Sequence, residues 1–105
     1  MSEFKGTKGE WNIKHSESKD AFNIIGTVLG GNYKIARIPY FIDETLPAFS
    51  ERSKTEAEAN AKLIAAAPEM LDLLNKALKR LEAINQSNND WLRGSIRELI
   101  KKATE

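Results

Sequence analysis

The sequence predicts an α+β protein with a small N-terminal antiparallel β-meander followed by a C-terminal helical hairpin with a kink or break at Pro68. In the β part, about residues 9–39, apolar and polar side chains alternate between turn residues, which is the pattern of half-buried strands. In the helical part, residues 53–104, helix formers dominate and apolar residues recur at helical spacing. We expect one domain over residues 1–105, with an apolar connection over residues 40–52.

The first two strands follow from period-2 alternation. Trp11 and Ile13 alternate with Asn12 and Lys14, so the first strand has one buried face. The polar run 15–20 is expected to be a turn. Residues Ala21 to Leu29 then form a second strand, because β-branched and aromatic residues are frequent in it.

A tight hairpin is predicted at Gly30-Gly31-Asn32, because these residue types adopt the positive φ that such turns need. The third strand runs from Tyr33 to Ile38 and is ended by Pro39. Its alternation places Tyr33, Ile35 and Arg37 on one face.

The connection 40–52 is unusually apolar for a loop. Loops are usually polar, so we expect this segment to pack on another surface, including that of a second subunit. A chain of this size buries a modest core, which also favours a homo-oligomer. The large apolar residues of the connection are Tyr40, Phe41, Ile42, Leu46 and Phe49.

Ser53 and Glu56 have the spacing of a capping box, so the next helix is predicted to begin near Lys54. Pro68 lacks an N–H donor, and its ring would clash with the carbonyl of Ile64 in a continuous helix. We therefore expect a helix to about residue 67 and a second helix that opens at Pro68.

The last helix is predicted to follow a polar turn at residues 86–90 and to be capped by Asn89 or Asp90. An apolar stripe allows this helix to lie antiparallel on the previous one. The stripe consists of Leu92, Ile96, Leu99 and Ala103.

Composition narrows the classes of function. The formal net charge of +1 gives no general attraction to nucleic acid, so we do not expect a nucleic-acid-binding protein. The absence of cysteine excludes disulfides, thiolate zinc sites and cysteine nucleophiles.

The sequence shows no signal peptide or membrane span, so the cytoplasm, without membrane partners, is the expected compartment. No motif indicates an enzyme, a cofactor or a metal, and His15 is expected to be a solvated turn residue.

The candidate binding residues are an amide, a set of cations and an aromatic. Asn60 falls on the apolar helix face, where an amide needs a hydrogen-bond partner in the protein, a ligand or a second subunit. Lys76 and Arg80 form one cationic row, and Arg93, Arg97 and Lys101 form another. Each row is suited to phosphate, and the alternative is a solvated face without a ligand. Phe49 is placed to stack on an adenine or to pack in the core.

Two pieces of the chain resemble a large group of small phage and prophage proteins. One is Gly-x-Trp at Gly9 to Trp11, and the other is EANAKLIAAAPEMLDLL at Glu58 to Leu74. Similar proteins often carry Thr-Pro-Gly-Pro-Trp at the first site, where Lys8 and Glu10 stand in this chain. The architecture is also similar to that of phage anti-Thoeris sponge proteins, which bind a cyclic ADP-ribose signal of bacterial immunity as oligomers and do not cleave it.

That resemblance implies a non-enzymatic protein that sequesters a cyclic nucleotide signal in the cytoplasm of an infected bacterium. The ligand would lie between subunits, in contact with Asn60, Phe49 and the four helix cations. The alternative, from another class, is a structural or adaptor protein whose helices dock on a phage or host protein.

Overall fold

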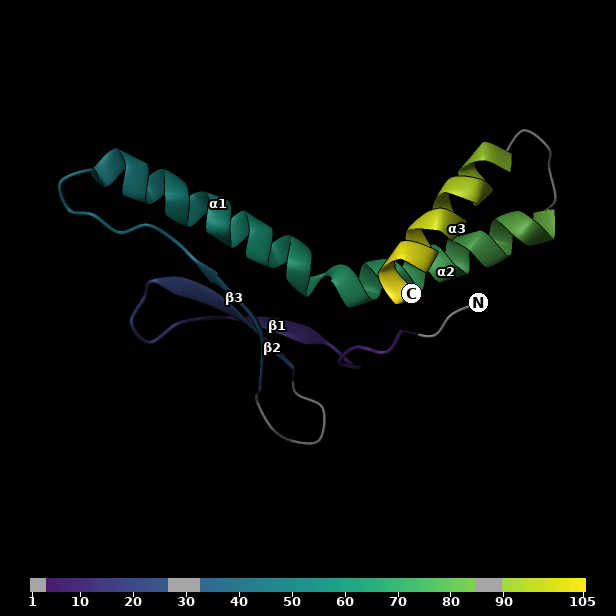
Figure 1. The fold of residues 1–105 in the computed structure, drawn as a ribbon, viewed down its shortest axis with the longest axis horizontal. Coiled ribbons are helices and arrows are strands. Elements are labelled where there is room, and N and C mark those ends of the chain that lie inside the picture. The colour runs from purple at the N-terminus through teal and green to yellow at the C-terminus, as the bar shows by residue number, and fades with distance from the viewer. Residues whose placement is uncertain (1–3, 27–32, 85–89) are drawn as a thin grey trace. The chain divides into compact units, whose positions relative to one another are not determined.

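A computed structural model describes residues 4–26, 33–84 and 90–105 of the chain (Figure 1). It confirms the α+β class, because an antiparallel sheet of three strands is followed by three helices. The chain divides into two compact units, Thr7–Pro68 and a second unit of Met1–Gly6 with Glu69–Glu105. The elements are β1 (Trp11–His15), β2 (Ala21–Gly26), β3 (Tyr33–Pro39), α1 (Pro47–Ala65), α2 (Ala67–Ile84) and α3 (Asp90–Thr104).

The sheet is a meander in the order β1-β2-β3, with β2 at its centre. Its register pairs Ile13 with Ile24 and Phe22 with Ile38. The predicted strands are thus confirmed where they are described, except that Pro39 does not end the pairing of β3: it is the last residue of the strand and pairs with Ala21. The predicted hairpin residues, 30–32, lie outside the described part of the chain.

One face of the sheet packs against α1. Phe22 and Ile24 from β2 form a buried cluster with Ala57 and Ala61 from α1. The two alanines let the helix approach the sheet closely, because they carry no side chain beyond Cβ. Ile24 is fully buried at the centre of the middle strand.

A β-bulge corrects the predicted faces of β3. The register between β2 and β3 shifts between Ile24 and Ile25, so that Ile24 pairs with Ala36 and Ile25 pairs with Lys34. The extra residue on β3 is Ile35. After it the alternation is displaced by one residue, and Arg37 is exposed instead of sharing a face with the half-buried Ile35.

His15 is not the solvated turn residue that the sequence predicted. It ends β1, stacks on the ring of Phe22 at 4.7 Å and lies 2.6 Å from the hydroxyl of Tyr40 through its Nε2. The Tyr40 hydroxyl donates its hydrogen to the carbonyl of Lys19. The imidazole Nε2 is therefore the donor to Tyr40, and this chain of hydrogen bonds ties the β1–β2 turn to the end of β3.

The helix predicted to begin near Lys54 begins at Pro47, so half of the predicted connection is helical. Proline is favoured in a first helical turn, where its missing N–H has no partner to lose. Ser53 is therefore no N-cap; its hydroxyl accepts from the backbone N–H of Phe41 at 2.9 Å. Ser50 similarly accepts from the N–H of Asp43 at 2.9 Å. These two serines hold residues 41–43 against α1.

The predicted discontinuity at Pro68 is confirmed. α1 ends at Ala65, α2 begins at Ala67, and Ala66 between them is bonded through its N–H to the carbonyl of Lys62. Pro68 is thus the second residue of α2, in the first turn, where proline costs little. The break falls within two residues of the predicted one.

α2 and α3 share a small apolar cluster and form the predicted hairpin. Leu78 packs with Ile96 and Ile100. The predicted stripe on α3 is therefore partly wrong, because Leu99 and Ala103 are exposed and Ile100 takes the buried position. α3 begins at Asp90, so the other capping candidate, Asn89, and most of the predicted turn lie outside the described residues. Within the described chain, no helix is long and apolar enough to cross a membrane.

Candidate functional site

The sheet face opposite α1 carries a hollow of about 770 Å³. All three strands and the β1–β2 turn contribute to it, so its walls come from one compact unit. Three cations, two hydroxyls, an amide and one carboxylate give the hollow its polar character. These side chains belong to Lys14, Ser16, Glu17, Ser18, Asn23, Lys34 and Arg37.

The strand register places a basic–amide–basic row across the hollow. Lys14 is the partner of Asn23 on β1, and Arg37 is the partner of Asn23 on β3. Directly paired residues project to the same side of a sheet with Cβ atoms about 5 Å apart. An anion above Asn23 would therefore be within reach of a cation from each edge strand.

The bulge adds a third cation to this face. Lys34 and Arg37 are three residues apart on β3, and in a regular strand an odd separation sends side chains to opposite faces. Because Ile35 is the extra residue, Lys34 pairs with Ile25 and shares the hollow with Arg37. Neither Lys14 nor Lys34 forms an ion pair with any described residue.

Asn23 brings an unsatisfied polar atom to the centre of the row. Its Oδ1 is buried and has no hydrogen-bond partner in the part of the chain that the structure describes. Leaving a buried acceptor unpaired costs about 1–3 kcal/mol. Because Oδ1 is buried, a hydroxyl or amino group of a ligand would satisfy this atom and recover that free energy once the amide turns toward the hollow.

Arg37 is already oriented by Asp20, whose carboxylate accepts from the guanidinium at 3.1 Å. The pKa of Asp20 is lowered by hydrogen bonds from Ser18 and then Ser16, and also by the charge of Arg37. Burial raises the pKa against these effects, by more than the charge of Arg37 lowers it. Asp20 therefore stays ionised and holds Arg37 at the rim. Lys14 and Lys34 supply the remaining positive charge of the hollow, which the carboxylate of Glu17 offsets in part.

Sequence reasoning missed this site, although part of the signal was present. The alternation that buries Trp11 and Ile13 already placed Lys14 on the opposite face. The register of Asn23 and the bulge at Ile35 are tertiary features that no single strand reveals.

The helix residues predicted to bind a ligand lie elsewhere. Asn60 is exposed on α1, so it does not point with the apolar face as expected; the buried residues beside it are Ala57 and Ala61. Phe49 is 57% exposed near the start of α1 and touches Phe41 in an edge-to-face contact at 4.9 Å. These positions do not test whether either residue binds a ligand.

The predicted cations on α2 and α3 have different surroundings. Lys76 pairs with Asp72 at 3.0 Å, and Arg80 is exposed with no ion pair to a described residue. Arg93 is mostly buried, where it pairs with Asp90 and donates to the carbonyl of Leu81 at 3.4 Å.

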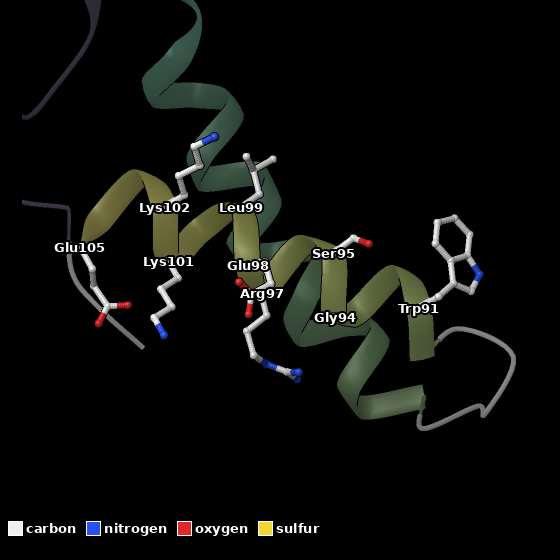
Figure 2. A pocket seen from close by; sticks show the side chains of 9 residues that line it. All are labelled: Trp91, Gly94, Ser95, Arg97, Glu98, Leu99, Lys101, Lys102 and Glu105. Atoms are coloured by element: carbon white, nitrogen blue, oxygen red, sulfur yellow. The ribbon is translucent and has the colours of Figure 1, made fainter.

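The fourth predicted cation, Arg97, lies 3.6 Å from Glu82. It lines a hollow whose walls come from α3 and from Glu105, which follows the helix (Figure 2). Lys76 and Arg80 are each about half a turn from Leu78, so both lie on the side of α2 away from α3. The structure therefore does not bring the α2 cations and Arg97 together within one chain. No group of three or more His, Asp or Glu residues able to hold a metal ion is found among the described residues.

Comparison with protein families gives one finding that covers the whole chain. Residues 1–105 match the family described as Salmonella phage P22 protein Y8K6. Comparison with curated proteins and with solved structures gives no match. The chain therefore belongs to the Salmonella phage P22 protein Y8K6 family and is a phage protein by descent.

Proposed function

We propose that this phage protein is a non-enzymatic binding protein that holds an anionic nucleotide on the open face of its sheet. The observation that carries the proposal is the row Lys14–Asn23–Arg37, with Lys34 beside it and an unpaired amide oxygen at its centre. The cations suit phosphate oxygens. The amide suits a hydroxyl or amino group of a sugar or base.

The resemblance to anti-Thoeris sponge proteins, together with membership of a phage family, favours a cyclic nucleotide of the cyclic ADP-ribose type. In this function the protein lowers the free concentration of the signal and releases it chemically unchanged. Sequestration needs affinity and not catalysis, which agrees with a site built of cations and an amide.

The test is isothermal titration of the full chain with cyclic ADP-ribose isomers and with cyclic di- and trinucleotides. The variant Lys14→Ala/Lys34→Ala should weaken binding strongly, because each charge-assisted hydrogen bond to phosphate is worth about 1.5–3 kcal/mol. The matched control, Lys76→Ala/Arg80→Ala, removes the same amount of charge from α2. Mass spectrometry of ligand released by heating should show an intact nucleotide.

Three results would count against the proposal. Absence of heat with every nucleotide contradicts nucleotide binding. Loss of affinity in the α2 variant, with full affinity in the sheet variant, moves the site to the helix cations. A hydrolysed ligand contradicts a protein that acts without catalysis.

A second candidate function, that of an adaptor, is favoured by the aromatic surface around Phe49. Phe41, Ile42, Leu46 and Phe49 are between 40% and 57% exposed, and the Phe41–Phe49 contact makes them one patch. Charged residues of both signs lie beside Phe41 and Ile42: Lys19, Asp43, Glu44, Glu51 and Lys54. Apolar patches rimmed by charge are typical of protein–protein contacts. A phage or host protein with an apolar site rimmed by charged residues would fit it, and loss of that partner on Phe49→Glu is the expected pull-down result.

A further inference from the structure

The hairpin of α2 and α3 has a second apolar face. On α2, Met70, Leu73, Ala77, Arg80 and Ile84 are spaced three and four residues apart in turn, which is heptad spacing. The buried seam of the same helix is Leu71, Leu74, Leu78 and Leu81, and it faces α3. A helix with two such seams requires a neighbour on each. Met70, Leu73 and Ile84 are 45%, 66% and 41% exposed, so the second seam is uncovered.

α3 also carries exposed apolar residues away from its buried seam. Trp91 is 72% exposed and Leu99 is 51% exposed, and with Ser95 they recur every four residues. Figure 2 shows Leu99 and Ser95 on one side of the helix, and Arg97 and Lys101 pointing the other way. The ion pair between Arg97 and Glu82 marks the polar side of the hairpin.

The two exposed stripes lie on the same side of the hairpin. Both are offset by about 100° in the same rotational sense from the residues that pack between the helices, Leu78 on α2 and Ile96 on α3. In two antiparallel helices, residues displaced by the same angle and in the same rotational sense from the line of contact point to the same side of the pair. The hairpin face consists of Met70, Leu73, Ala77, Ile84, Trp91 and Leu99.

We propose that the hairpin face is a homodimer interface, covered by the hairpin face of a second copy. Charge complementarity selects a second copy. Arg80 on α2 and Glu98 on α3 border this face, and neither forms an ion pair with a described residue. Lys102, which Figure 2 shows on the same side of α3 as Leu99, adds a second cation without an ion pair to a described residue. The surface therefore carries charges of both signs, as a two-fold contact of a surface with itself requires.

The positions of Arg80 and Glu98 along the hairpin axis agree with ion pairs between Arg80 of one copy and Glu98 of the other. Leu78 packs against both Ile96 and Ile100, so Glu98 lies near the level of Leu78. Arg80 is two residues further along α2, a rise of about 3 Å. When a two-fold axis parallel to the hairpin places α2 of one copy beside α3 of the other, each Arg80 meets the Glu98 of its partner. This inference is independent of the nucleotide site, because all its residues lie in the other compact unit.

The experiment is sedimentation velocity on the full chain over a concentration series. The wild type should be a dimer, and Leu73→Glu should weaken it at least about thirtyfold, the usual effect of losing an interface anchor. Leu63→Glu is the matched control, because Leu63 on α1 is 61% exposed and lies outside the hairpin face. It should leave the dimer intact. Circular dichroism checks that each variant keeps its helix content.

A charge exchange keeps the test decisive if Leu73→Glu fails to fold. Arg80→Glu should weaken the dimer, and Arg80→Glu/Glu98→Arg should restore it. A monomeric wild type overturns the proposal. A dimer that Leu73→Glu or Arg80→Glu leaves unchanged also overturns it. A dimer that only Phe49→Glu dissociates overturns it as well, because the contact then lies on the aromatic surface of α1. If Arg80→Glu/Glu98→Arg does not restore the dimer, the hairpin face belongs to a different partner and the proposal is also overturned.

Discussion

At the scale of single residues, the two isoleucines that pair across β1 and β2 should contribute unequally to the free energy of unfolding. Ile24 is fully buried, whereas its partner Ile13 is 37% exposed. Ile24→Ala should lower the free energy of unfolding by about 2–5 kcal/mol, because the lost burial is joined by a cavity that β2 cannot close. Ile13→Ala is the matched control and should cost less than half as much. Urea unfolding measures both, and equal losses would contradict the assigned core.

Asp20 links a single residue to pH. The hydrogen bonds from Ser18 and Ser16 lower its pKa in the folded protein below the ordinary value of 3.8. Its ionised form therefore stabilises the fold, fully above pH 3.8 and progressively less as the pH falls through the lowered pKa. Asp20→Asn should reduce the free energy of unfolding at neutral pH, and the difference from the wild type should shrink in acid. A difference that grows in acid would contradict this sign.

The elements show where sequence reasoning succeeds and where it stops. Period-2 alternation located β1 and β3 closely, and proline chemistry located the break between α1 and α2 within two residues. The start of α1 was misplaced because Ser53 has capping-box spacing, yet Pro47 and the turn before it begin the helix earlier. The face of Arg37 was misplaced because a bulge depends on two strands at once. The sheet site was missed for the same reason.

Pro68 provides a prediction at the scale of elements. Because Pro68 lies in the first turn of α2, Pro68→Ala should change the free energy of unfolding by less than about 1 kcal/mol. Ala61→Pro, in the interior of α1, should cost about 3 kcal/mol or more by removing a helical hydrogen bond. Urea unfolding followed by circular dichroism compares the two. A large gain in stability from Pro68→Ala would mean that the break is strained.

At the scale of the whole molecule, the two compact units suit two different tasks. The unit of the sheet and α1 carries the polar hollow, and the unit of α2 and α3 carries the hairpin face. The sequence analysis assigned ligand binding to the helix cations because rows of cations on a helix can be recognised from residue spacing alone. The cations of the hollow come from different strands, and only pairing brings them together. Membership of a phage family fits both a binding and an interaction role.

The most direct test of the central claim is a titration of isotopically labelled protein with cyclic ADP-ribose, followed by amide NMR. Binding at the sheet predicts the largest shift changes at Lys14, Asn23, Lys34 and Arg37, saturating with a single affinity. Lys14→Ala/Lys34→Ala should abolish these changes while the spectrum stays that of a folded protein. Changes confined to α2 and α3, or none at ligand concentrations well above those of a signalling nucleotide, would contradict nucleotide binding on the sheet.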